Sequence, residues 1–289
     1  MKYGIYYAYW EKEWGGDFCN YISKVKKLGF DILEVACGDF HTKKLEYFKE
    51  ARKIAEAENI LFTGGYGPRP EHNLASEDEK LVEKAFDFWK DCFEKMATAG
   101  IYSIGGALYS YWPVDFKAGF DKEADKARSI ERMKQLADIA AEYEITLNME
   151  VLNRFEGYMI NTCEEGMDYV KKVDKPNVKI MLDTFHMNIE EESMTEPIIK
   201  AGSHLGNFHV GEANRKPPYQ GSRMPWEEMG KALKEIGYNG SIVMEPFVVR
   251  GGKVGQDISV WRDIVADTSE KSLDKAASDS VKFLRDLWG

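Results

Sequence analysis

Eight short apolar segments recur along the chain, and they constrain its fold more than any other feature of the sequence. Many are rich in β-branched or aromatic residues, which is typical of buried strands. The segments are YGIYYAY (3–9), FDILEVA (30–36), ILFTGGY (60–66), YSIGGALY (102–109), ITLNMEVL (145–152), VKIMLDTF (178–185), LGNFHVG (205–211) and SIVMEPF (241–247). The sequence therefore predicts eight strands.

Longer amphipathic stretches lie between these segments and predict helices. They cover residues 17–28, 43–58, 77–99, 123–143, 163–173, 194–202, 226–236 and 273–287. Several are followed by glycine, as in KKLGFD, ATAGIY and KEIGYNG, which is typical of a helix C-terminus. This alternation predicts an α/β fold, a (β/α)8 TIM barrel that forms a single domain over residues 1–289. A doubly wound sheet is the rival, but no strand is followed by a glycine-rich dinucleotide or phosphate motif.

The composition excludes several classes of partner. The formal net charge is −10, and a duplex or membrane-surface binder normally has a basic face, so we expect neither nucleic acid nor membrane as a partner. The four cysteines are scattered without a CxxC pair, which favours reduced thiols. No apolar run approaches about 18 residues, and the polar start does not resemble a signal peptide. We therefore expect a soluble cytoplasmic protein.

Four of the later segments carry a side chain that can bind a metal. Glu150, Asp183 and Glu245 lie near the ends of the fifth, sixth and eighth segments, and the seventh contains His209. Their separations of 33, 26 and 36 residues approximate one strand–helix unit. A barrel would therefore bring all four to one rim, and the C-terminal rim is where such barrels carry out their chemistry.

Three carboxylates and one imidazole are a suitable ligand set for a divalent metal. Oxygen-rich ligation with a single nitrogen favours Mn(II), Co(II) or Mg(II) over structural zinc, which prefers thiolate and histidine. Taken alone, a carboxylate near a strand end more often caps a helix or pairs with a surface base. A lone histidine in an apolar strand is more often a core residue. Four such residues in register favour the metal site.

Longer stretches around these segments resemble the ketose 3-epimerases, the D-psicose (allulose) and D-tagatose 3-epimerase family. The resemblance extends from the first residues to about residue 265 and is weakest over 38–60 and in the last helical stretch. It is carried by GIYYAYWEKEW, GGALYSYWPVDF, MEVLNRFEGYMINT, VKIMLDTFHMNIEE, HVGEANRK, IVMEPFV and the region from GGKVG to VWRDI.

This resemblance implies a metal-dependent enzyme, with Mn(II) or Co(II) preferred, that inverts carbon 3 of free ketohexoses. It implies a (β/α)8 barrel and a homodimer or homotetramer. The implied metal ligands are Glu150, Asp183, His209 and Glu245. The implied substrate-binding residues are Glu156, His186 and Arg215 at the carbonyl end of the sugar, Tyr6, Trp14, Trp112 and Phe247 in the pocket wall, and Ala107.

Some positions leave alternatives open. Tyr66 in GGYGP and Ala213 in GEANRK stand where some relatives carry other residues, and both bear on sugar preference. From its spacing alone, Arg215 is either a substrate ligand or a solvated loop charge. His186 either projects from a loop towards the sugar or caps the next segment.

Inversion at carbon 3 explains why two glutamates are expected. The hydrogen on carbon 3 is α to the ketone, so its removal produces an enediolate whose charge a metal stabilises. A single base tends to return the proton to the face from which it came. Two carboxylates on opposite faces, which we predict to be Glu150 and Glu245, act as general base and general acid.

Other functions remain as alternatives. An aldose–ketose isomerase or a metal-dependent DNA-repair phosphodiesterase could use the same barrel, and a non-catalytic sugar-binding protein is an alternative of another class. Phosphodiesterases of this kind bind several metals through many histidines, and five histidines in an acidic chain count against one. The presence of both Glu150 and Glu245 counts against mere binding, which does not need two bases.

Overall fold

Eight parallel strands form a closed barrel at the centre of the molecule. The computed structural model describes residues Met1–Gly289, and each strand pairs with its neighbour in sequence until β8 returns to β1. The strands are β1 (Lys2–Tyr6), β2 (Ile32–Ala36), β3 (Leu61–Gly65), β4 (Ile101–Gly106), β5 (Thr146–Glu150), β6 (Val178–Asp183), β7 (Leu205–Val210) and β8 (Ser241–Met244). The predicted TIM barrel is confirmed.

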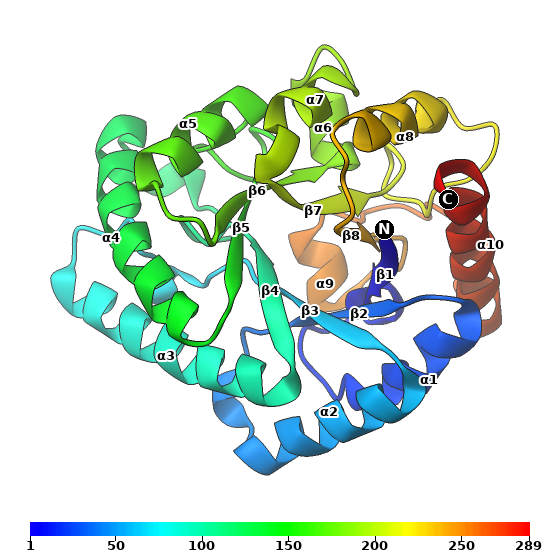
Figure 1. The fold of residues 1–289 in the computed structure, drawn as a ribbon, viewed down its shortest axis with the longest axis horizontal. Helices are drawn as coiled ribbons and strands as arrows, with labels where there is room; N and C mark the ends of the chain where they lie inside the picture. The colour runs from blue at the N-terminus through cyan, green and yellow to red at the C-terminus, as the bar shows by residue number, and fades with distance from the viewer.

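The main helices surround this barrel, as Figure 1 shows. The α-helices are α1 (Cys19–Leu28), α2 (Leu45–Glu58), α3 (Glu79–Ala99), α4 (Lys122–Glu142), α5 (Cys163–Val173), α6 (Thr184–Glu190), α7 (Glu196–Ala201), α8 (Trp226–Glu235), α9 (Gly252–Asp257) and α10 (Glu270–Trp288). Short 3-10 helices are η1 (Tyr7–Trp10), η2 (Phe40–Thr42), η3 (Pro70–His72), η4 (Phe116–Ala118) and η5 (Gly202–His204).

Local sequence signals define many of the helix ends. The Asp78 carboxylate accepts a hydrogen bond from the Lys80 amide at the start of α3, and the Thr162 hydroxyl accepts one from the Glu165 amide at the start of α5. At the other end, Gly100 follows α3 with φ 81°, a left-handed conformation that glycine adopts without steric penalty. The expected C-terminal glycine is thus found where the chain turns from α3 into β4.

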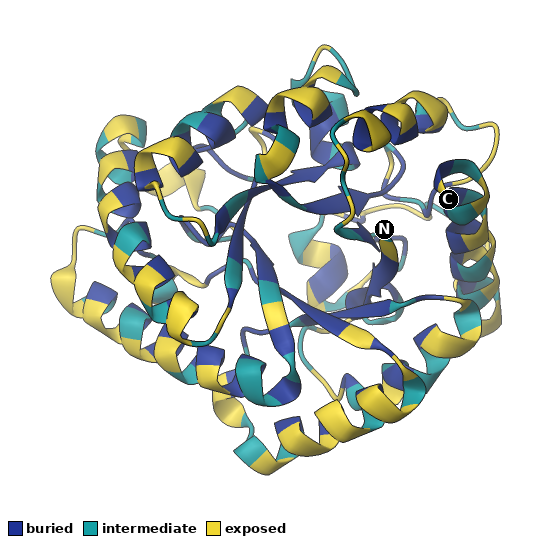
Figure 2. Cartoon of the chain, viewed as in Figure 1, coloured by how far each residue is buried: buried dark blue, intermediate teal, exposed yellow.

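The core lies between the barrel and the inner faces of the helices. In Figure 2 the strands and the barrel-facing sides of the helices are mostly buried, while the outward sides are exposed. One cluster of 77 buried apolar residues spans this layer. At the contact between α8 and α10, Trp288 packs so closely on Gly230 that an added Cβ would lie 2.2 Å from its ring. The barrel therefore has a closely packed wall behind the strands.

The observed elements differ from the predicted ones mainly at the C-terminal ends of strands. The chain leaves β1 after Tyr6 because residues 7–10 coil into η1, and β8 ends before Glu245, which precedes a proline. The α6 helix begins directly after Asp183, so it occupies part of the predicted sixth strand. The short helix α9 was not predicted. These ends form the rim at which the candidate site lies.

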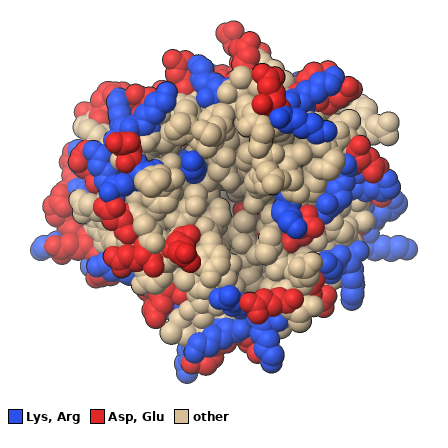
Figure 3. All heavy atoms as spheres, in the orientation of Figure 1, with Lys and Arg blue, Asp and Glu red and all other residues tan.

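The surface carries both signs of charge. On the face shown in Figure 3, acidic and basic side chains are interspersed around the perimeter, and the centre is mostly uncharged. None of the helices has the length and apolar character needed to cross a membrane.

Candidate active site and metal centre

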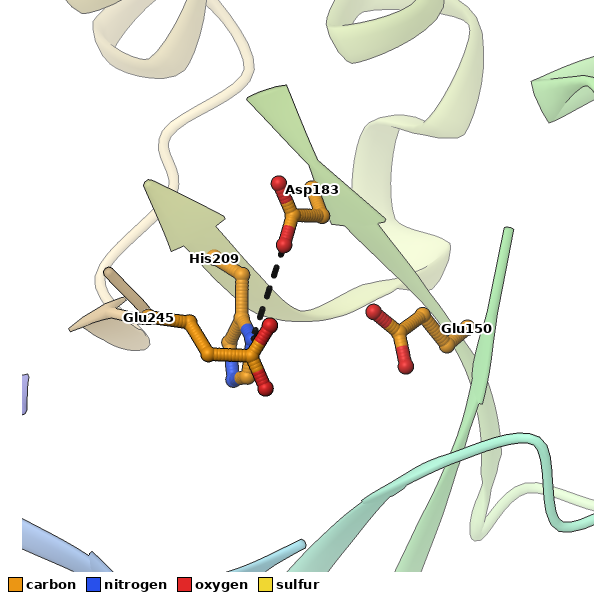
Figure 4. A group of neighbouring side chains, drawn as sticks. All are labelled: Glu150, Asp183, His209 and Glu245. Atoms are coloured by element: carbon orange, nitrogen blue, oxygen red, sulfur yellow. Dashed lines mark ion pairs between the residues drawn. The ribbon is translucent and has the colours of Figure 1, made fainter. Parts of the chain in front are cut away.

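Four side chains from the last four strand ends converge in a single cluster. Glu150 ends β5, Asp183 ends β6, His209 lies near the end of β7 and Glu245 follows β8. Each offers a ligand atom, and these atoms lie within 4.8 Å of one another. The strand register brings Asp183 beside His209 as direct pairing partners across β6 and β7. Figure 4 shows the four side chains directed towards a common space.

Asp183 contributes one oxygen to the fold and leaves the other free. Its Oδ1 accepts a hydrogen bond from the Phe185 amide at 2.6 Å and so caps the N-terminus of α6. Its Oδ2 is buried, has no hydrogen-bond partner and lies 3.9 Å from His209 Nδ1. The sequence offered helix capping and metal ligation as alternatives, but the geometry allows this carboxylate to do both.

The donor set fits one divalent metal ion. Buried polar atoms normally have partners, yet Asp183 Oδ2 and His209 Nδ1 have no hydrogen bond. His209 Nδ1 also lies 3.7 Å from Glu245 Oε2, so the ring nitrogen and the carboxylates face the same space. Carboxylate oxygens with one imidazole suit Mn(II), Mg(II) or Co(II). An ion bound by these four residues would satisfy the unpartnered atoms.

Burial and mutual repulsion set the charges in the cluster. Burial and the adjacent Glu245 carboxylate raise the pKa of Glu150 well above its usual range. Burial opposes ionisation of Glu245 too, but contacts with His209 and Arg215 hold the pKa of Glu245 below its usual value. The two glutamates therefore have different electrostatic environments within a few ångströms of each other.

His186 lies in the first turn of α6, rather than in a loop as the sequence suggested. Its Nδ1 accepts a hydrogen bond from the Asn153 amide at 3.2 Å, and its Nε2 lies 3.6 Å from Glu150 Oε1. Burial lowers the pKa of His186, although Glu156 opposes this shift. Because Nδ1 accepts a hydrogen bond from a backbone N–H, it carries no proton, and the ring proton is on Nε2. That N–H faces Glu150 at the edge of the pocket.

Arg215 connects the metal cluster to the rest of the pocket. Its guanidinium lies 3.1 Å from Glu245 and 3.3 Å from Glu156, and it stacks on Phe185 with 3.8 Å between the guanidinium carbon and the ring centroid. It is 5% exposed, although it belongs to the loop after β7. The solvated-loop alternative for Arg215 is thus wrong, because a ring of carboxylates and aromatic faces encloses the charge.

A cavity of about 490 Å³ opens above the cluster. It is lined by the four predicted wall residues, Tyr6, Trp14, Trp112 and Phe247, and by Ala107, which was predicted to bind substrate. Trp14 is held in place because its indole N–H donates to Asp257 of α9 at 2.8 Å. Tyr66 also lines this cavity, whereas Ala213 lines a neighbouring one.

Tyr66 is part of a polar and aromatic group beside the pocket. Its hydroxyl oxygen accepts a hydrogen bond from the Arg69 amide at 3.2 Å and lies 2.6 Å from His72 Nδ1. The Tyr66 hydroxyl and the His72 ring nitrogen are therefore hydrogen-bonding partners, and the His72 tautomer decides which of the two donates. His72 also stacks on Phe88 with 3.6 Å between ring centroids.

Comparison with known proteins identifies the family. Residues 22–287 match the family model described as "Xylose isomerase-like TIM barrel". The chain is 50% identical to D-psicose 3-epimerase of Enterocloster bolteae, over 100% of this chain and 96% of the relative. It is 47% identical to D-psicose 3-epimerase of Agrobacterium fabrum, over 100% of both chains. The chain belongs to the D-psicose 3-epimerase family. The family predicted from the sequence motifs is confirmed.

Solved structures of this epimerase family agree with the fold. The crystal structure of D-psicose 3-epimerase with D-tagatose from Clostridium cellulolyticum H10 superposes with a TM-score of 0.98 at 49% identity, covering 100% of this chain and 99% of that one. A crystal structure of D-psicose 3-epimerase in the presence of D-fructose also gives 0.98, at 47% identity and full coverage of both chains.

Two polar residues that contact predicted site residues were not identified from the sequence. Asn153 holds His186 through its backbone amide and its side chain. Glu34, in the middle of β2, is buried and lies 2.7 Å from His209 Nε2. The available signal was a single carboxylate inside the apolar run ILEVA (32–36), where a side chain that faces the barrel interior needs a polar partner.

Proposed function

We propose that this chain is a metal-dependent epimerase that inverts carbon 3 of free ketohexoses, interconverting D-fructose and D-psicose, with D-tagatose and D-sorbose as a further pair. The observation that supports it most is that Glu150 and Glu245 share one buried cluster with Asp183 and His209, below an aromatic-walled cavity. Relatives named D-psicose 3-epimerase, with 47–50% identity over nearly the whole chain, support the same substrate class.

Glu150, Asp183, His209 and Glu245 would hold one divalent ion, which we propose to be Mn(II) or Co(II), with Mg(II) as a weaker substitute. When bound, such an ion supplies Lewis acidity that stabilises negative charge on the sugar oxygens at carbons 2 and 3. Metal loading is therefore expected to be required for activity.

In the proposed reaction, the two glutamates act on opposite faces of carbon 3. One carboxylate removes the carbon-bound proton, and the electron pair moves into the C2–C3 bond to give an enediolate. The carboxyl group of the other glutamate then delivers a proton to the opposite face, which inverts the centre. The reverse epimerisation exchanges the two roles, so neither glutamate is acid or base in both directions.

Three neighbouring residues would fix the reacting end of the sugar. The His186 Nε2–H faces the cluster and can donate to a hydroxyl or carbonyl oxygen. Arg215 and Glu156 form a part-buried donor–acceptor pair at 3.3 Å, which suits adjacent sugar oxygens. The aromatic wall offers apolar ring faces to the C–H face of the sugar.

Solvent isotope exchange tests this two-base mechanism. In deuterated water the wild-type enzyme should place deuterium at carbon 3 of the product, because the arriving proton comes from a different carboxyl group. Glu150→Gln and Glu245→Gln, checked first for retained metal, should lose epimerisation. Each should still exchange the carbon 3 hydrogen of the one epimer that faces its remaining carboxylate, so the two variants should prefer opposite epimers.

The mechanism is wrong if both variants exchange the same epimer, or if either epimerises at a near-normal rate with metal bound. A panel of ketohexoses and ketopentoses, assayed with and without Mn(II), tests the substrate class. In the same assays, aldose formation would instead indicate an aldose–ketose isomerase, and sugar binding without turnover would indicate a binding protein.

We also propose that the enzyme is a homodimer or homotetramer. Large aromatic side chains are exposed beside the pocket, with Phe155 at 72% and Trp261 at 68%. Both line a second cavity of about 480 Å³ that adjoins Arg215. Exposed aromatic residues in a contiguous patch are typical of protein interfaces. Light scattering on purified protein tests this, since a monomeric mass would contradict it.

A further inference from the structure

Glu34 is a buried carboxylate to which the proposed reaction gives no role. It belongs to β2, whereas the proposed metal ligands lie at the ends of β5 to β8, and it is 1% exposed. A carboxylate enclosed in a barrel is destabilising unless it is paired or hydrogen-bonded. Its surroundings therefore indicate what it does.

The two nitrogens of His209 face different partners. Nδ1 faces the cluster, at 3.7 Å from Glu245 Oε2 and 3.9 Å from Asp183 Oδ2. Nε2 faces away from the cluster and lies 2.7 Å from Glu34 Oε1. Neither of these two atoms has another hydrogen-bond partner. The pair is thus a close contact between a ring nitrogen and a carboxylate oxygen that have only each other as polar neighbours of this kind.

Glu34 is itself held from its other oxygen. The Thr63 hydroxyl of β3 donates to Glu34 Oε2 at 2.8 Å, and these two residues are pairing partners in the β2–β3 register. The Asn207 side-chain amide, two residues before His209 on β7, contacts the same oxygen at 3.4 Å. The carboxylate is thereby oriented with Oε1 directed at the imidazole.

We propose that Glu34 is a positioning residue for His209, which keeps the Nε2 proton and the ring orientation so that Nδ1 is available to the metal. This inference rests on the proposed metal site. Histidine ligands commonly direct their second nitrogen to a carboxylate, and loss of such a partner typically weakens metal binding by about 10- to 100-fold. Glu34 does not touch the substrate in this scheme; it acts through His209.

Metal affinity measured on stripped protein tests the proposal without relying on turnover. Wild type, Glu34→Gln and Thr63→Val are titrated with Mn(II) against a competing chelator, and the Co(II)-loaded forms are compared by visible absorption. Glu34→Gln should bind Mn(II) about 10- to 100-fold more weakly and show an altered Co(II) spectrum. Thr63→Val, which removes the hydroxyl that orients Glu34, should weaken binding in the same direction by less.

Two further variants keep the test decisive. Glu191→Gln removes a half-buried carboxylate that bonds only the Cys163 amide, and it should bind Mn(II) as wild type does. If Glu34→Gln fails to fold, Glu34→Asp replaces it, since it retains the charge. Its side chain is one methylene shorter and cannot reach His209 in the same way, so this variant should also bind the metal more weakly. Wild-type affinity and an unchanged Co(II) spectrum in the folded Glu34 variant would leave it as a core residue only. Failure of the wild type to bind Mn(II) would instead overturn the metal site itself.

Discussion

Removing the Arg215 guanidinium should destabilise the metal-stripped protein far more than the metal-loaded one. Arg215 is buried and lies within 3.6 Å of three carboxylates, those of Glu156, Asp183 and Glu245. Without an ion, it is a major source of positive charge for this group. Breaking a buried ion pair by deleting one partner typically costs about 3–5 kcal/mol.

This magnitude converts to a measurable shift in melting temperature. For a domain of 150–250 residues, 1 kcal/mol corresponds to roughly 2–4 °C, and this longer chain falls near the lower end. Arg215→Ala should therefore melt roughly 6–10 °C below wild type in EDTA. In saturating Mn(II) the difference should shrink, because the ion replaces positive charge beside the same carboxylates.

Differential scanning calorimetry in EDTA and in Mn(II) measures both shifts. Arg215→Lys is the matched control, since it keeps the charge but loses the planar two-nitrogen contact to Glu245 and Glu156. It should recover most of the stability and little of the activity. If Arg215→Ala and wild type melt together in EDTA, the guanidinium is not the counter-ion of the stripped cluster, and the electrostatic reasoning fails.

Three further changes test other parts of the molecule. Treatment with EDTA should lower both the melting temperature and the epimerase activity, and Mn(II) should restore both. The reason is that a ligand of the folded state stabilises it by mass action. A melting temperature that does not change with the ion would contradict the metal site. Burial lowers the pKa of His72 from 6.5 to about 4. Protonation of His72 therefore does not reduce the free energy of unfolding above pH 6.5, the unfolded-state value, and reduces it progressively as the pH falls from 6.5 to about 4. His72→Gln keeps a hydrogen-bonding side chain beside Tyr66 but does not titrate, so its free energy of unfolding, measured in urea, should fall less than that of the wild type between pH 6.5 and about 4. An equal fall in the variant and the wild type would refute this. Gly230→Ala places a Cβ 2.2 Å from the Trp288 ring, so it should lower the free energy of unfolding by about 1–3 kcal/mol and leave kcat unchanged. An unaltered midpoint of urea unfolding would show that α8 and α10 move apart without cost.

The barrel could be predicted because each buried strand corresponds to a separate apolar segment in the sequence. Sequence could not fix where strands end at the functional rim, because side-chain contacts decide those ends. Asp183 shows this: its carboxylate caps α6 at once, so strand and helix follow without a connecting residue. The short helix α9 forms where Trp14 bonds Asp257, a contact between chain segments 243 residues apart.

The candidate site was predictable in so far as its residues lie in recognisable motifs at strand ends. The four-residue cluster and the aromatic wall could be named in this way. The supporting contacts could not, because they join distant segments. Glu34 looks like an isolated charge in a strand until the barrel closes and brings His209 against it. Likewise, Arg215 in sequence is a loop cation beside a lysine, and folding alone reveals its burial between Phe185 and the carboxylates.

The division of the pocket between the two halves of the barrel has a consequence for how such proteins diversify. The proposed metal ligands come from β5 to β8, whereas most of the wall, including Tyr6, Tyr66 and Trp112, comes from the first half. Mutations in the first half can thus reshape the fit to different sugars while the chemical apparatus is inherited unchanged. Two first-half residues nevertheless contact the proposed ligands, because Glu34 lies against His209 and the Tyr109 hydroxyl donates to the Glu150 carbonyl oxygen. Recombination between half-barrels of different relatives should succeed where both contacts are preserved across the junction.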